Sequence, residues 1–203
     1  MGGGGGTEIN IEQLIDLQPG LIMTQRFSAD DTTYPIIQEA GLPVVINADF
    51  LDTSPLGLAE WGKFISLFFN TEGLAQAQFA TVQTRYEELA VLAKMADNRP
   101  TVLAGTPFDG TWFMPGGASY LATLIRDAGG NYLWAEDEST GSLFLDFETV
   151  LDTAVDADYW VNIFQTTKTD VLGLDTRLEQ FTAFEGSAYS NNARSNANGG
   201  SDY

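Results

Sequence analysis

The chain has 203 residues, of which 44% are hydrophobic and 18% charged, so it can form a packed core and is not disordered over most of its length. Nine Lys and Arg against 28 Asp and Glu give a formal net charge of −19, which excludes nucleic acid as a partner and disfavours an anionic membrane. Cys and His are absent, which excludes thiol chemistry, disulfides, Ser-His-Asp triads and the usual transition-metal ligands.

The first 54 residues alternate short helices with short apolar strands. Asn10 followed by Gln13 is a capping-box pattern, which indicates a helix start, and Pro19-Gly20 indicates the end of that helix. The predicted elements are a helix over 11–17, a strand over 21–23, a helix over 34–40 and a strand over 44–46. Such alternation is typical of a parallel sheet with helices on its faces.

Two consecutive helices are predicted next. Ser54 caps the first, and its apolar residues recur at i, i+3, i+4 and i+7, which places them on one helix face. These residues are Trp61, Phe64, Ile65 and Phe68. After Asn70-Thr71 the second helix is predicted over 72–96. The longest apolar run, 64–69, is far too short to cross a bilayer, which needs roughly 20 residues.

The remainder of the chain repeats the alternation of strands and helices. The predicted elements are strands over 101–104, 131–134, 143–145 and 159–163, and helices over 119–128, 147–155 and 172–181. Residues 112–117 are predicted to form a loop after the first of these strands. The whole pattern predicts an α/β fold.

One segment occurs twice. Residues 10–16 and 146–152 are both capped helix starts with Glu at the second helical position, then two apolar residues and an Asp, and each precedes a buried strand. Two Rossmann-like lobes joined by a long helix are the simplest explanation, although two amphipathic helix starts can also be alike by chance. The expected divisions are a glycine tail over 1–6, a partial N-terminal lobe over 7–54, a spine helix over 55–71, a C-terminal lobe over 72–186 and a polar tail over 187–203 that returns toward the first lobe.

The two ends of the chain differ from the rest in composition. Gly2–Gly6 lack the apolar core of a signal peptide and predict a flexible linker. The tail from residue 187 onward is polar and rich in Gly and Asn, and no closing helix or strand is predicted there. We expect both ends to be cut from a longer protein.

Several segments resemble one family when taken together. Residues 10–23, NIEQLIDLQPGLIM, resemble a segment of the periplasmic binding proteins that serve ABC importers of iron–siderophores, haem and cobalamin. Residues 112–134 and 141–160 resemble the second-lobe half of the same family, and the likeness extends over nearly all of 7–203. The resemblance implies two α/β lobes joined by a rigid helix, with the ligand held between them. It also implies that the first lobe is incomplete, because family members have further strands before the first motif.

The same resemblance implies a docking role for two carboxylates. In this family a Glu at one helix start in each lobe meets arginines of the membrane permease, and the matching positions are Glu12 and Glu148. A carboxylate in the first helical turn also suits the positive end of its own helix, so each Glu can instead have only that local role.

The ligand candidates follow from the ends of the predicted strands, where open α/β sheets place their binding crevices. They are Thr24, Gln25, Arg26, Phe27, Asp49, Phe50, Trp112, Phe113, Tyr120 and Arg194. Aromatic walls with a few Arg suit a large metal chelate. The alternatives are ordinary packing for Trp112 and Phe113 and plain surface charges for Arg26 and Arg194.

Two further motifs have weaker functional interpretations. Pro115-Gly116-Gly117 before a helix can present N–H groups to an anion, but a tight turn is the simpler prediction. The acidic loop over 136–138 lacks the spacing of a calcium loop.

We therefore interpret the chain as a non-catalytic, monomeric, extracytoplasmic substrate-binding component of an ABC importer. Its expected partners are a metal chelate and the permease, and no cofactor or metal site is expected. The alternatives are a carboxylate-dependent hydrolase, which needs two facing acids, or a truncated or engineered lobe without ligand function.

Overall fold

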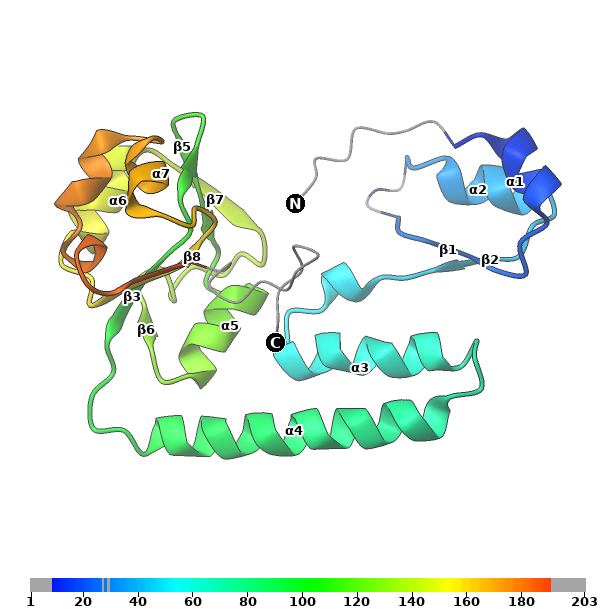
Figure 1. Cartoon of the computed structure of the whole chain (residues 1–203), viewed down its shortest axis with the longest axis horizontal. Helices are drawn as coiled ribbons and strands as arrows, with labels where there is room; N and C mark the ends of the chain where they lie inside the picture. The colour runs from blue at the N-terminus through cyan, green and yellow to red at the C-terminus, as the bar shows by residue number, and fades with distance from the viewer. Residues whose placement is uncertain (1–8, 27, 29, 191–203) are drawn as a thin grey trace. The chain divides into compact units, whose positions relative to one another are not determined.

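The computed structural model describes residues 9–26, 28 and 30–190. The chain divides into two compact units, Met1–Asp52 and Thr53–Tyr203, and most of their helices and strands are labelled in Figure 1.

The first unit contains the helices and strands that the sequence predicts. Its elements are α1 (Ile11–Leu17), β1 (Ile22–Thr24), α2 (Thr33–Glu39), β2 (Val44–Ile46) and the 3-10 helix η1 (Asp49–Leu51). The Asn10 side chain accepts a hydrogen bond of 3.0 Å from the Gln13 N–H and so begins α1. Strands β1 and β2 pair in parallel, with Ile22 opposite Val44. Among the described residues of this unit, Ile37 is the only buried hydrophobic side chain.

The second unit begins with an antiparallel helix pair, α3 (Pro55–Ser66) and α4 (Glu72–Lys94) (Figure 1). Asn70 adopts a left-handed conformation, with φ 54°, in the tight connection between them. Tyr86 of α4 donates a hydrogen bond of 2.7 Å from its hydroxyl to the Asp127 carboxylate at the end of α5 (Tyr120–Asp127). This bond attaches α4 to the α/β part of the unit, and burial raises the pKa of the Tyr86 hydroxyl.

A parallel sheet forms the centre of the second unit. The strands of this sheet lie in the order β6 (Asn131–Tyr132), β3 (Thr101–Ala104), β8 (Tyr159–Ile163) and β9 (Ala188–Ser190). The second unit also contains the α-helices α6 (Phe147–Ala154) and α7 (Lys168–Leu172). The expectation of a tail without a strand is wrong at its start, because residues 188–190 pair with β8. The polar composition of the tail concealed this strand.

The loop predicted over 112–117 is largely a strand. A three-stranded antiparallel sheet is built from β4 (Pro107–Phe108), β5 (Thr111–Pro115) and β7 (Ser142–Leu145). Asp109 and Gly110 connect β4 to β5 with φ of 48° and 75°, the left-handed pair that a tight hairpin turn requires. This Asp-Gly pair was the signal in the sequence that could have predicted the hairpin.

The helix predicted over 172–181 is also wrong. Helix α7 ends at Leu172, and two 3-10 helices follow it, η2 (Thr176–Gln180) and η3 (Thr182–Phe184). The Asp175 side chain accepts a hydrogen bond of 2.9 Å from the Arg177 N–H. This bond starts a new turn at Asp175 and so interrupts the continuous helix that was predicted.

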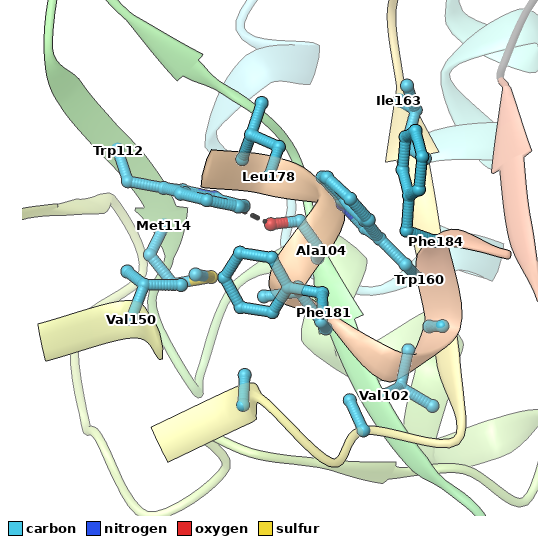
Figure 2. Close-up of a cluster of buried hydrophobic side chains, with 14 of the residues drawn as sticks. Val102, Ala104, Trp112, Met114, Val150, Trp160, Ile163, Leu178, Phe181 and Phe184 are labelled. Atoms are coloured by element: carbon cyan, nitrogen blue, oxygen red, sulfur yellow. Dashed lines mark hydrogen bonds between the residues drawn. The ribbon is translucent and has the colours of Figure 1, made fainter. Parts of the chain in front are cut away.

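An aromatic cluster forms the core of the second unit (Figure 2). The rings of Trp112, Trp160 and Phe181 lie within 5.4–5.9 Å of one another. The Trp112 indole donates a hydrogen bond of 2.9 Å to the Ala104 carbonyl, and the Trp160 indole donates one of 2.7 Å to the Gly105 carbonyl. Both buried N–H groups are therefore satisfied at the carboxyl end of β3.

Candidate functional site

The predicted ligand residues of the first unit meet where β1 and β2 end. Gln25 follows β1, and its side-chain amide donates a hydrogen bond of 3.3 Å to the Asp49 carboxylate after β2. Phe50, next to Asp49, is partly exposed. Strand pairing in parallel brings these residues together, because both strands end at the same edge.

Four other predicted ligand residues are less informative. Thr24 ends β1, and its hydroxyl donates a hydrogen bond of 3.3 Å to the Gln25 carbonyl, while Arg26 is half-buried. Phe27 and Arg194 lie outside the described residues.

Trp112 is a core residue and does not line a surface. Its side chain is 0% exposed and its indole N–H is bound to the Ala104 carbonyl. Trp112 therefore packs in the core and does not bind a ligand, because a ligand has no access to the indole. Tyr120, the first residue of α5, is half-buried beside its cap Ser119.

Phe113 has the opposite environment from Trp112. Successive side chains of a strand point to opposite faces, so Trp112 and Met114 of β5 enter the core while Phe113 points away from it and is 43% exposed. Phe113 pairs across the sheet with Phe144 of β7, which is 73% exposed, and their rings meet edge to face at 5.3 Å. Phe144 is not among the site residues that the sequence predicts.

Phe108 belongs to the same face. It pairs with Thr111, which lies two residues before Phe113, and cross-strand partners share a sheet face. Phe108 is 74% exposed. We call this surface the aromatic face; with its neighbours in register it comprises Phe108, Thr111, Phe113, Pro115, Ser142 and Phe144. None of these six residues is charged.

The two helix starts singled out in the sequence are exposed. In α6 the Asp146 side chain accepts a hydrogen bond of 2.7 Å from the Thr149 N–H, and this bond lowers the pKa of Asp146. Glu148 is 73% exposed, and its carboxylate pairs with Arg177 at 2.7 Å. In α1, Glu12 is exposed and forms no ion pair with any residue that the structure describes. Both carboxylates are accessible to a partner.

The Pro115-Gly116-Gly117 segment is a closed turn. The Gly116 N–H donates to the Gly141 carbonyl at 2.7 Å, and the Ala118 N–H donates to the Ser139 carbonyl at 3.1 Å. The Ser139 hydroxyl and N–H donate to the Asp137 carboxylate, and these bonds lower the pKa of Asp137. The N–H groups of Gly116 and Ala118 are thus used within the chain and are not directed at an anion.

The carboxyl groups of the described residues shift their pKa values in one direction. In this part of the chain, the carboxyl pKa values that depart from the ordinary range are all lowered, because backbone or side-chain groups donate hydrogen bonds to the ionised form. These groups belong to Asp31, Asp137, Asp146, Asp158 and Asp175. A glycosidase acid requires the opposite shift. Within the described ranges, no three acidic residues converge as metal ligands would.

Solved structures of binding proteins share this arrangement of elements. The haem-binding protein HutB of Vibrio cholerae superimposes with a TM-score of 0.70 at 19% identity, over 90% of this chain and 71% of that one. The vitamin B12-binding protein BtuF of the same organism gives 0.64 at 15%, over 91% and 69%. The fold is thus the two-lobe α/β fold of periplasmic binding proteins.

The sequence shows the family directly. The periplasmic binding protein family matches residues 1–185, and the chain belongs to this family. It is 30% identical over 161 residues to the uncharacterized lipoprotein MJ0878 of Methanocaldococcus jannaschii, covering 78% of this chain and 38% of that protein. A second uncharacterized lipoprotein of that organism, MJ0872, is 25% identical over 87% of this chain and 47% of its own length. The chain therefore spans less than half of the curated relatives it matches.

In the part of the chain that is described, every helix is too short or too polar to cross a membrane.

Proposed function

We propose that the chain is a non-catalytic substrate-binding component of an ABC importer, acting outside the cytoplasm as a monomer and capturing a metal chelate. The observation that carries this proposal is the aromatic face, with three large exposed rings on one rigid sheet. Exposed aromatic groups on a well-packed scaffold are typical of a binding surface. Family membership and the haem- and B12-binding proteins of the same fold support it.

The chemistry of the aromatic face selects among chelates. Phe108, Phe113 and Phe144 offer apolar and edge-to-face contacts, and no side chain of the face carries a charge. Such a surface favours a ligand with a broad apolar or conjugated surface, such as a tetrapyrrole, over a compact anionic chelate, which needs cationic groups. Gln25 and Asp49 are proposed as polar contacts in the first unit.

Delivery is proposed to occur through Glu12 and Glu148. Both occupy the second position of an exposed helix start, where the carboxylate suits the helix dipole and can pair with an arginine of the permease. The high net negative charge of the chain would steer it toward a basic surface.

Ligand binding can be tested by titrating the chain with haem, cyanocobalamin and a ferric hydroxamate chelate while tryptophan fluorescence is followed. All four Trp lie in the second unit, which also carries the aromatic face. Haem or cyanocobalamin should bind more tightly than the hydroxamate, and Phe144→Ala should weaken binding by about ten-fold, through lost area and ring contact.

The matched control is Phe69→Ala, because Phe69 is an exposed Phe of the same unit in the α3–α4 connection. It should leave binding unchanged. Equal losses in both variants, or saturable binding of none of the three chelates, would contradict the proposal.

The docking role is tested separately. Glu12→Arg and Glu148→Arg together should lower association with the permease complex without changing ligand affinity, since neither residue belongs to the proposed ligand surface. Unchanged uptake and association would remove the docking assignment and leave the ligand proposal standing.

A further inference from the structure

The surroundings of Glu148 contain a fixed guanidinium. Arg177 of η2 binds Asp175 through Nη2 at 2.7 Å and through Nε at 3.1 Å, while the Arg177 N–H also donates to the same carboxylate at 2.9 Å. The guanidinium carbon lies 4.0 Å from the centre of the Phe147 ring. Phe147 is buried and packs against Phe181 in the core. Arg177 is thus held from below by a core ring and from the side by a bidentate carboxylate.

The remaining nitrogen of this guanidinium is directed at the exposed carboxylate of α6. Arg177 Nη1 donates to Glu148 Oε1 at 2.7 Å, and the Glu148 side chain stays 73% exposed. One carboxylate oxygen therefore has a fixed partner, and most of the side chain remains accessible. Asp175 offsets the charge of Arg177, so the three groups together keep the single negative charge that Glu148 contributes.

We propose that Arg177 is a positioning residue for Glu148: it holds the carboxylate in one orientation, so that the contact point of the second unit is formed before a basic partner arrives. The inference rests on the docking role proposed above for Glu148. An exposed Glu otherwise loses rotamer freedom when it binds, and a carboxylate that is already held avoids most of that loss. Glu12, with no ion pair to the described residues, lacks this device.

Removing Arg177 has two opposite effects on docking. It frees the Glu148 side chain, which weakens association, and it makes the chain more negative, which strengthens attraction to a basic surface. A control with the same charge change separates them. Lys168 is suitable, since its ammonium pairs with Glu185 at 3.2 Å and lies 5.0 Å from the centre of the Phe184 ring, and it forms no ion pair with Glu148.

The experiment compares Arg177→Met with Lys168→Met in the whole chain, measuring the Kd for the permease–ATPase complex of the importer in nanodiscs at about 0.15 M salt. Arg177→Met should bind about five-fold more weakly than Lys168→Met, the factor expected for one side chain that must be ordered on binding. Arg177→Lys, which keeps the charge but not the planar fork, should recover part of the loss.

A second comparison shows whether Arg177 acts through Glu148. On a Glu148→Gln background, Arg177→Met should produce no further loss, whereas a general structural defect would add to it. Tryptophan-fluorescence melts of each variant verify folding. If Arg177→Met unfolds, Arg177→Lys replaces it in both comparisons. Docking by Arg177→Met as tight as by Lys168→Met, or an equal loss on both backgrounds, would overturn the inference. If Glu148→Gln alone leaves docking unchanged, the docking role of Glu148 fails and the positioning role fails with it.

Discussion

The two units share a local pattern and differ in burial. Each has a capped helix start with Glu at its second position, and each has parallel strands. In the second unit β3 has a parallel neighbour on each side, and Val102, Leu103 and Ala104 are all buried. In the described part of the first unit β1 pairs with β2 alone, and all three residues of β2 are only half-buried. Local sequence is sufficient for the capped helix starts that the two units share, whereas burial depends on how many layers cover an element.

The largest effect should come from the core of the second unit. Trp160→Ala should lower its free energy of unfolding by about 3–5 kcal/mol, because it removes a fully buried ring and leaves the Gly105 carbonyl without its indole partner. Thermal melts followed by tryptophan fluorescence measure this, since the three Trp that remain in the variant all lie in this unit. Ile37→Ala in the first unit should leave the same transition in place. A common shift in both variants would show that the units unfold as one.

A smaller loss of stability is expected where a glycine packs closely against the backbone. Among the described glycines, such packing occurs only in the second unit. A Cβ at Gly117 would overlap the backbone carbonyl oxygens of Trp134, Ala135 and Asp137, so Gly117→Ala should destabilise the second unit by about 1–3 kcal/mol. Gly141→Ala is the control, because its Cβ would meet nothing within 4 Å, as is also true of Gly20 in the first unit. Equal unfolding curves for the two alanine variants would disprove the close packing at Gly117.

Acid should weaken the two units through different contacts. Asp158 accepts hydrogen bonds of 2.8 Å from both the N–H and the hydroxyl of Thr101 and so joins segments 57 residues apart, while Asp31 accepts one of 2.8 Å from the N–H of Thr33, two residues away. These bonds lower the pKa of each carboxyl. A lowered pKa means that the stabilisation is complete above the ordinary Asp value of about 4 and is lost as the pH falls through the lowered one.

The second unit should therefore lose a few degrees of Tm through Asp158 as the pH is brought from 7 to about 3. Asp158→Asn should lower the Tm at neutral pH and flatten its dependence on pH. Asp31→Asn should not affect the tryptophan transition. If the pH dependence is the same with and without Asp158, another carboxylate is responsible.

The smallest effect is expected at the paired helix starts. Glu12→Gln and Glu148→Gln should each change the free energy of unfolding by no more than about 0.5 kcal/mol, because both side chains are exposed. Circular dichroism melts measure this. A large loss of unfolding free energy in Glu148→Gln alone would show that the ion pair of Glu148 with Arg177 stabilises the fold and does not serve to position Glu148 for a partner.

Much of the fold could be predicted from residues with strong local preferences. Asn10, Ser54 and Asp146 begin helices where their side chains predict it, and the α/β class follows from the alternation of elements. The hairpin at Asp109-Gly110 was missed although its turn signal is present. Strand β9 could not be predicted, because its residues become a strand only through pairing with β8.

The site was predictable to a lesser degree. Gln25 and Asp49 were expected together, and their hydrogen bond brings them together. The adjacent aromatic residues Trp112 and Phe113 received the same prediction but have opposite environments, and Phe144 was not considered. The alternation of side chains along a strand predicts that Trp112 and Phe113 point to opposite faces. Which of the two is buried depends on which face of the sheet is covered.

The sequence by itself determined the helix starts, the α/β alternation, the acidic surface and the family to which the chain belongs, because each depends on residue type or on short-range spacing. Tertiary structure alone decided that Trp112 enters the core, that Phe113 meets Phe144 on an exposed face, and that Arg177 reaches Glu148. These contacts join residues up to 69 positions apart, as Trp112 and Phe181 are, and no local preference encodes a contact whose partners meet only when strands pair and helices pack.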